Sequence, residues 1–190
     1  PWTLMLVLTS SLIAFAIGSL AGILAAWRRG GSFDSIGAPI ALMMQAMPPL
    51  VTSLLALFLF SIYWPVFPTG YAYDPEIDPG LSLDFFCSVF KHAFLPIVTM
   101  ALAQVGGYLI TMRNSMINLL GEDYIVLGTA KGLSDRRLRM AYAARNALLP
   151  TVTSFAMTLG ASFGGALVTE VVFNYPGLGY TLFQGITARD

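Results

Sequence analysis

The positive charge of this chain is concentrated in residues 128–150, which read GTAKGLSDRRLRMAYAARNALLP. This basic stretch carries five of the ten lysine and arginine residues, and mostly apolar sequence flanks it on both sides. Cations beside membrane spans are expected from topology and from anionic lipid headgroups alone. That general expectation does not account for the ordered pattern Ala130-Lys131-Gly132, followed by Arg145-Asn146-Ala147-Leu148-Leu149-Pro150.

Chemistry of other kinds is not visible in the sequence. It has no nucleophile–base pair and no phosphate-binding G-x-x-x-x-G-K-[ST] motif. Cys87 and His92 are the single cysteine and the single histidine, so neither has companions for a metal site. The acidic residues Asp74, Glu76 and Asp78 lack the glycine and later glutamate of a calcium loop. We therefore expect no enzyme activity, no metal and no cofactor in this chain.

Composition places the basic stretch in a membrane protein. The chain is 56% hydrophobic and 11% charged with no net charge, whereas soluble domains are about a quarter charged. Four uncharged runs each supply the roughly 20 apolar residues that a helix needs to cross a bilayer. They are Trp2–Trp27, Ser35–Tyr73 (apolar over about 40–63), Ala93–Met112 and Asn146–Thr169. We predict an all-α, polytopic transmembrane helical bundle, with residues 1–190 forming a single domain.

Loop charges predict the orientation. Eight of the ten cations lie between the first two runs or between the last two, so these loops should be cytoplasmic. The loop at about 65–92 carries Lys91 against four acidic residues and is rich in proline and glycine. We predict an irregular outer loop there, with a short helix after Ser82 and with both ends of the chain facing outward.

Two helices and a tight turn are predicted in the cytoplasmic loop at about 113–150. The first helix should run over 114–127, continuing inward from the third span, with Gly128 and Gly132 interrupting it. Such a compact loop is rigid enough to pass force to a partner docked against it.

The second helix of this loop should begin after Ser134, which is a good N-cap, and continue from Asp135 to about Leu148. Pro150 should then open the fourth span, where its missing N–H is harmless.

The basic stretch resembles the cytoplasmic signature loop of ABC-importer permeases, specifically the dipeptide, oligopeptide and nickel permease family. That loop carries a small residue, a glycine and a terminal Leu-Pro, for which Ala130, Gly132, Leu149 and Pro150 stand here. The Glu-Ala-Ala triplet of the general signature is absent, and Thr129 stands nearest to it. The long gap before RNALLP is similar to the peptide and nickel branch.

A second segment resembles the same branch. Residues 170–190 read EVVFNYPGLGYTLFQGITARD, with a Phe-x-Tyr-Pro-Gly-Leu-Gly core followed by Arg-Asp. The resemblance covers 94–190 by motif and 1–93 by topology only. It implies the type I ABC-importer permease fold, whose members usually have six spans, so that four are expected here in a chain that is part of a longer one.

The resemblance further implies a multi-pass permease subunit in the prokaryotic inner membrane that forms half of a substrate pathway. The implied partners are a homologous permease subunit, two ABC ATPases that bind ATP and magnesium, an extracytoplasmic solute-binding protein and membrane lipid. A nucleic acid is not expected. Gly132 is expected at a position of the turn where a Cβ would collide with neighbouring atoms. The implied ATPase-coupling residues are Thr129, Ala130, Lys131, Gly132, Leu133, Ser134, Arg136, Arg137 and Arg139, and the loop-end motif is Arg145, Asn146, Leu149 and Pro150.

Three kinds of residue are candidates for the substrate pathway or its gate. Two polar residues of the third span could line the route or bond neighbouring helices. Small residues every four positions in the fourth span could pack within the chain or against the partner permease. An acidic residue at the outer end of the fourth run could attract a peptide amine, help dock the binding protein, or simply lie at the membrane interface. The turn that follows it could fold back into the outer mouth as a plug. Pro48 and Pro49 should kink the second span. The candidates are, in that order, Gln104 and Tyr108; Gly160 and Gly164; and Glu170, Tyr175, Pro176 and Gly177.

Several functions remain open at this point. Di- and oligopeptides are the leading substrates, with nickel complexes or oligosaccharides as alternatives in the same branch. A secondary transporter driven by an ion gradient would favour charged residues inside the spans or broken inverted repeats. A membrane scaffold that transports nothing has no need for two permease motifs in register.

Overall fold

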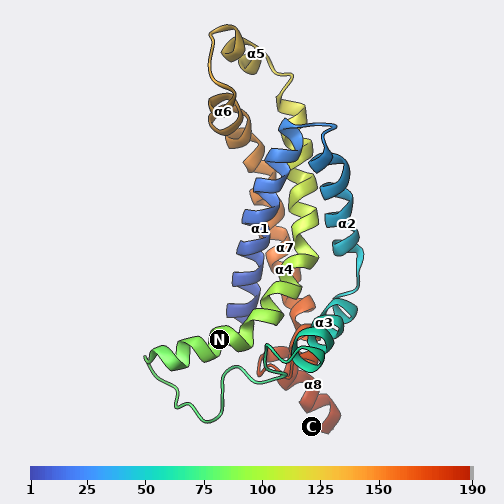
Figure 1. Ribbon diagram of the computed structural model, residues 1–190, viewed down its shortest axis with the longest axis vertical. Coiled ribbons are helices and arrows are strands. Elements are labelled where there is room, and N and C mark those ends of the chain that lie inside the picture. Colours follow the sequence, from blue (N-terminus) through green and yellow to red (C-terminus); the bar gives the residue numbers. More distant parts are fainter. Residues whose placement is uncertain (189–190) are drawn as a thin grey trace. The chain divides into compact units, whose positions relative to one another are not determined.

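The computed structural model describes residues 1–188, and this part of the chain is helical without a strand (Figure 1). Three short segments, labelled η, are wider π-helical turns. In chain order the elements are α1 (Trp2–Trp27), η1 (Phe33–Gly37), α2 (Ala38–Ala46), α3 (Pro49–Leu57), η2 (Phe58–Tyr63), α4 (Leu83–Leu119), α5 (Asp123–Ala130), α6 (Asp135–Arg137), η3 (Leu138–Ala144), α7 (Arg145–Val172) and α8 (Leu178–Ala188).

The predicted all-α membrane fold is confirmed for the described residues. Three helices are long and apolar enough to cross a membrane, namely Trp2–Trp27, Leu83–Leu119 and Asp135–Val172. A fourth span results if the interrupted pair Phe33–Ala46 and Pro49–Tyr63 is counted as one. The first predicted run coincides with α1. The short helix expected after Ser82 is instead the beginning of α4, which continues without a break through the third run.

The kink expected in the second span is a complete break of the helix. Helix α2 ends at Ala46, and Pro48 has an extended backbone with ψ 135°. The cause lies in the Pro48-Pro49 pair, since a proline excludes α-helical geometry from the residue before it. Helix α3 then starts at Pro49, where a missing N–H leaves no bond unmade.

The chain divides into two compact units, each with its own core. Unit 1 comprises Pro1–Ser11, Met47–Ala103 and Leu159–Asp190, and unit 2 comprises Leu12–Ala46 and Gln104–Thr158. The buried core of unit 1 is formed by Leu6, Val7, Ala72, Ala93, Leu95, Met100, Ala166, Phe173 and Tyr175. That of unit 2 is formed by Ile23, Ala26, Met112, Met116, Ile125, Ala143, Ala144 and Ala147.

In unit 2, two glycines let α1 approach the backbone of α4. A Cβ added at Gly18 would lie 2.7 Å from the Val105 carbonyl oxygen, and one at Gly22 would lie 2.5 Å from the Leu109 carbonyl oxygen. Four-residue spacing of small residues is the usual signature of close packing between membrane helices. The Gly-x-x-x-Gly spacing was therefore a signal that the sequence analysis did not use.

The small-residue face that the sequence analysis did single out behaves differently. A Cβ built at Gly160 or Gly164 would meet no atom of the described residues within 4 Å. Both glycines are exposed, as are Ala156 and Ala161. No described residue therefore packs against this face, and both alternatives, packing within the chain and packing against a partner permease, stay predictions.

We expect a Gly22→Val substitution to destabilise the isolated subunit strongly. The added side chain would overlap a carbonyl oxygen of α4, which cannot rotate away as a side-chain end could. Overpacking of this kind typically costs about 1–3 kcal/mol. Thermal unfolding of the purified subunit should show a clear loss for Gly22→Val and almost none for the matched control Gly164→Val. Equal effects of the two substitutions would contradict the assigned packing.

Candidate functional site

The predicted tight glycine turn of the cytoplasmic loop is present, and it has a defined hydrogen-bond pattern. Helix α5 ends at Ala130, and Gly132 adopts a left-handed backbone with φ +75°. The Gly132 N–H donates to the Thr129 carbonyl at 2.9 Å, and the Leu133 N–H donates to the Gly128 carbonyl at 3.2 Å. These two bonds make a Schellman motif, which satisfies the last carbonyls of a helix and favours glycine at the left-handed position. We call α5, this turn and α6 the elbow.

The reason for glycine at position 132 differs from the expected one. A Cβ at Gly132 would meet no atom of the described residues within 4 Å. Steric overlap within the turn is therefore not the reason why glycine is favoured here. The constraint is the positive φ, which L-residues other than asparagine and aspartate rarely adopt.

The predicted first helix of the loop, 114–127, is also corrected. Helix α4 ends at Leu119, and α5 begins at Asp123 after the N-cap Glu122. Gly121 weakens the helix at this point, and the two acidic residues favour the positive N-terminus of a new one. Gly128 does not interrupt α5; it lies inside the helix and faces Leu138, whose Cδ2 would be 2.6 Å from an added Cβ.

One face of α5 is apolar and uncovered. Ile125 and Gly128 are buried against the rest of unit 2, whereas Val126 and Leu127 are 60% and 55% exposed. Thr129, Ala130 and Lys131 are exposed beside them. A short helix that is apolar all round needs a second partner for the side it leaves open. Val126 and Leu127 were not among the predicted docking residues, although this all-round apolar character is readable from the sequence.

The second helix of the loop is longer than predicted. From Asp135 the chain stays helical through α6, η3 and α7 to Val172. Pro150 lies inside α7 and does not open a span, so that expectation is wrong. Ser134 does occupy the N-cap, with extended backbone (ψ 146°), but its hydroxyl makes no capping bond; its carbonyl accepts from the Arg137 and Leu138 N–H groups.

Side chains of the loop tie the elbow to the surrounding helices of unit 2. The Asn146 side-chain amide of the loop-end motif donates to the Tyr124 hydroxyl on α5 at 3.3 Å. The guanidinium of Arg139 lies 5.7 Å from the centre of the Trp27 ring at the end of α1. Leu149 is 69% exposed and takes no part in these contacts. The basic stretch is thus partly structural, while Arg136 and Arg137 are exposed.

A buried ion pair beside the elbow was missed by the sequence analysis. The Nε and Nη2 atoms of Arg113 donate to the two carboxylate oxygens of Asp34 at 2.5 Å and 2.8 Å, and the Gly30 N–H donates to Oδ2 at 3.0 Å. This two-pronged geometry is the strongest form of arginine–carboxylate pairing. It joins η1, which follows the first basic loop, to the end of α4. The sequence feature that could have indicated this pair is Asp34, a lone acidic residue in a basic loop that is predicted to be cytoplasmic.

An Asp34→Asn substitution should destabilise unit 2, because it leaves the Arg113 guanidinium without a charged partner. The Asp34 side chain is 6% exposed and that of Arg113 is 23% exposed. Removing one partner of a buried ion pair typically lowers the free energy of unfolding by about 3–5 kcal/mol. Because Arg113 is partly exposed, we expect a loss of about 3 kcal/mol or less here. Thermal unfolding with Arg136→Gln as a control tests this; the control should behave like the unmodified protein, and equal unfolding temperatures for both variants would refute the assignment.

In unit 1, Glu170 caps the N-terminus of α8. Its carboxylate is fully buried, and Oε2 accepts from the Gly179 N–H at 2.6 Å and from the Tyr180 N–H at 3.4 Å. The Thr3 hydroxyl of α1 accepts from the Leu178 N–H at 2.8 Å. Two residues distant in sequence therefore satisfy the N–H groups that the first turn of a helix leaves unpaired.

The glycines of the outer turn make room for this carboxylate. A Cβ at Gly177 would overlap the Glu170 carboxyl group, and one at Gly179 would lie 2.6 Å from the Leu167 Cα. Tyr175 is buried, and its N–H donates to the Glu170 carbonyl at 2.8 Å. Burial raises the pKa of the Tyr175 hydroxyl, and the neighbouring carboxylate raises it further.

The buried position of Glu170 does not fit a simple interface residue. Its Oε2 is held by α8, whereas Oε1 has no hydrogen-bond partner among the described residues, so a role toward a peptide amine or a docking protein stays a prediction. Its hydrogen bonds make it a cap that fixes the turn. Pro176 is the exposed member of that turn, and its role as a plug stays a prediction.

The polar candidates of the third span lie in unit 2. Tyr108 is 2% exposed, with its ring centre 5.7 Å from that of Phe15 and 6.3 Å from that of Phe155. This placement makes Tyr108 a packing residue in the described structure rather than the lining of an open route. Gln104 is half-buried. Gly106 allows α2 to approach, because a Cβ there would lie 2.5 Å from the Ala41 carbonyl oxygen.

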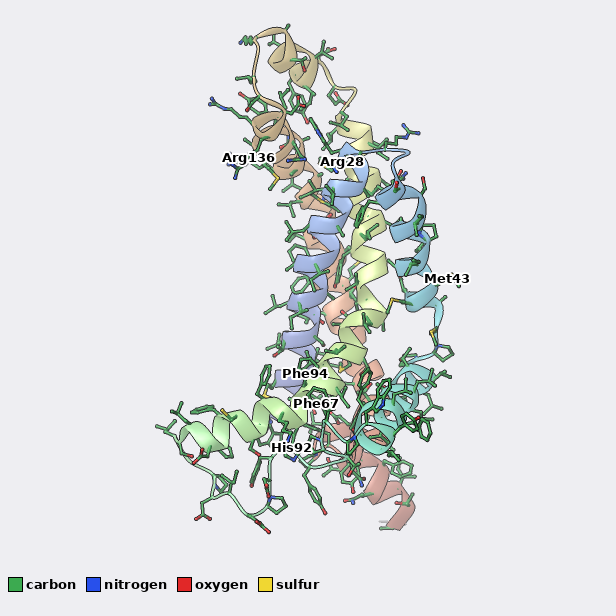
Figure 2. The ribbon with its side chains drawn as sticks, in the orientation of Figure 1. Arg28, Met43, Phe67, His92, Phe94 and Arg136 are labelled. Atoms are coloured by element: carbon green, nitrogen blue, oxygen red, sulfur yellow. The ribbon has the colours of Figure 1, made fainter. Side chains whose placement is uncertain are left out.

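Long apolar helices and basic loops together define a polytopic membrane protein. Figure 2 shows Arg28 of the first basic loop and Arg136 of the second at the same end of unit 2, as the predicted orientation requires. Residues 18–190 match the family described as binding-protein-dependent transport system inner membrane component, and the chain belongs to this family. It is therefore a multi-pass inner-membrane component of a binding-protein-dependent transport system.

The relatives of the chain are peptide permeases by name. It is 33% identical over its full length to the di/tripeptide transport system permease protein DppB of Pseudomonas aeruginosa UCBPP-PA14. It is 32% identical over 99% of its length to the dipeptide transport system permease protein DppB of Escherichia coli K12, and equally so to a putative peptide permease protein of Brucella suis. The chain covers 60%, 60% and 57% of these three proteins.

Proposed function

We propose that this chain forms half of the substrate pathway of a binding-protein-dependent ABC importer and that its substrates are di- and oligopeptides. The substrate class is supported by three relatives whose names specify peptides, dipeptides or di- and tripeptides. A homologous permease supplies the other half of the pathway. An extracytoplasmic binding protein delivers the peptide, so this subunit does not need to hold it tightly.

The elbow is the observation that carries this proposal. It presents an uncovered apolar face at Val126 and Leu127, flanked by exposed cations, in a loop predicted to be cytoplasmic. An apolar centre with a charged rim is the usual composition of a protein interface. We assign an ABC ATPase as its partner. ATP and magnesium are bound there, and this chain holds no cofactor of its own.

Coupling then follows from the continuity of the helix behind the elbow. The helix from Asp135 to Val172 has 38 residues, which corresponds to about 57 Å at 1.5 Å per residue. A displacement of the elbow by the closing ATPases acts on one end of this rod and tilts the other. ATP binding thus biases a two-state membrane element, as ligand switches generally do.

Uptake by reconstituted vesicles tests the proposal. The complete transporter, with its ATPases and binding protein, should accumulate a radiolabelled dipeptide when ATP is enclosed with the ATPases. An imposed proton or sodium gradient without ATP should give no uptake. Gradient-driven uptake would indicate a secondary transporter. Competition by nickel or an oligosaccharide, but not by unlabelled peptide, would overturn the substrate class.

A further inference from the structure

The beginning of α4 forms an arm that departs from the rest of its helix. Figure 1 shows the first turns of α4 bending away from the turns that come next within unit 1, and Pro96 lies inside this helix. Pro96 cannot donate a hydrogen bond to the His92 carbonyl, and its ring crowds that carbonyl, so a bend at this point has a local cause. We call Leu83–His92 the outer arm.

Two faces of the outer arm are accounted for within unit 1. Phe85 packs on Tyr73, with ring centres 5.1 Å apart. A second face, polar and about a quarter-turn away, lines an open hollow of about 690 Å³ together with the outer loop. This polar face is tied to the loop, because the Asp74 N–H donates to the Ser88 hydroxyl at 2.8 Å. The polar face consists of Asp84, Ser88, Lys91 and His92.

The third face is apolar and nothing in the described structure covers it. Leu83, Phe86 and Phe90 are 82%, 54% and 66% exposed. Their spacing of three and four residues places them on one side of the helix. Leu81, immediately before the arm, is 98% exposed. An apolar stripe opposite a charged face is the pattern of a helix that lies in the plane of a membrane surface.

We propose that the apolar face of the outer arm rests in the outer phospholipid interface, so that the arm lies along the bilayer surface. The arm is the beginning of α4, a helix that is long and apolar enough to cross a membrane, so its apolar face lies close to the predicted bilayer. Tyr63 and Trp64 of the same unit are 65% and 56% exposed, and such aromatic residues gather at the headgroup level.

The distribution of charge supports lipid as the occupant of this face. Asp84 and Lys91 lie on the polar face, and the stripe itself has no polar side chain at its centre. Apolar residues on one side and charged residues on the other are the arrangement of helices that lie in the plane of the membrane interface.

The single cysteine of the chain makes a sharp experiment possible. In a Cys87→Ser background, single cysteines are introduced at positions 83, 86 and 90 of the apolar face and, as exposed controls, at 84 and 91 of the polar face and at 78 of the outer loop. Each is spin-labelled in the intact transporter in phospholipid vesicles. Relaxation by oxygen, which partitions into lipid, is compared with relaxation by a water-soluble nickel chelate.

We expect the oxygen-to-chelate ratio to be severalfold higher at all three apolar positions than at the three controls, repeating with the helical period. Equal ratios on both faces would overturn the proposal, because the arm would then stand in water. Labels at 83, 86 and 90 that are immobilised and shielded from both reagents would overturn it as well, because a protein would then cover the stripe.

Discussion

Replacing Gly132 with valine is expected to reduce ATP-driven uptake strongly while leaving membrane insertion unchanged. Gly132 closes the Schellman turn with φ +75°. A left-handed backbone costs an ordinary L-residue about 1–2 kcal/mol, and a β-branched residue is at the unfavourable end. A loss of 1–2 kcal/mol changes the equilibrium constant for forming the turn by about 5–30-fold. Uptake should fall by up to the same factor, since only the intact elbow presents Val126 and Leu127 to a partner.

Asparagine at the same position separates the two possible causes of such a defect. Asparagine tolerates the left-handed conformation, and the space around Gly132 is open within the chain. Gly132→Asn should therefore retain most of the uptake. Gly121→Val is a second control, because Gly121 lies in the same loop, has equally open surroundings and is not in the left-handed region. Similar losses with valine and asparagine would show that a partner's surface, and not the backbone, excludes the side chain.

The second large effect is expected at the outer turn. A Glu170→Ala substitution removes the acceptor for the Gly179 and Tyr180 N–H groups in a fully buried place. A buried donor left unpaired costs about 1–3 kcal/mol, and the shorter contact, to Gly179, should account for most of the loss. We expect a loss of about 3 kcal/mol in the free energy of unfolding and faster proteolysis between Phe173 and Gly177.

A graded series tests whether capping is the reason. Glu170→Gln keeps an oxygen that can accept from the Gly179 N–H but removes the charge. Its free energy of unfolding should therefore fall by about half as much as that of Glu170→Ala. Thr3→Val removes the cap on Leu178 from a different helix and should cost about 1 kcal/mol. Thr187→Val is the control, because that exposed hydroxyl only bonds carbonyls of its own helix. Equal stability of Glu170→Ala and Thr187→Val would contradict the cap.

Hydropathy and charge predicted the membrane fold because a bilayer requires long uncharged helices with basic loops on one side. The glycine turn at 132 was also predictable, since the need for a positive φ is local. What local reasoning missed depends on partners far along the chain. Asp34 can be recognised as half of an ion pair only once Arg113 is known to lie beside it. In the same way, Glu170 and Thr3 can be recognised as caps only once the start of α8 is known to lie beside them.

Errors inside the basic stretch have a similar origin. Pro150 was expected to begin a helix, as prolines do in isolation, but the helix continues through it from Asp135. Gly128 was expected to end a helix, but contact with Leu138 gives it a packing role within α5. In both cases tertiary structure overrode a residue's local preference. The neighbour of Gly160 and Gly164 could not be predicted, because spacing alone does not say which helix a small-residue stripe meets.

Site-specific cross-linking tests the central claim most directly. In the intact transporter, with Cys87 replaced by serine, a photo-reactive group is attached at Val126 or Thr129 of the elbow and, as a control, at Asp78 of the outer loop. Our account predicts cross-links from both elbow positions to the ATPase subunit, changing in yield when ATP binds, and none from Asp78. Elbow groups that never reach an ATPase in a complex that hydrolyses ATP and transports peptide would contradict it.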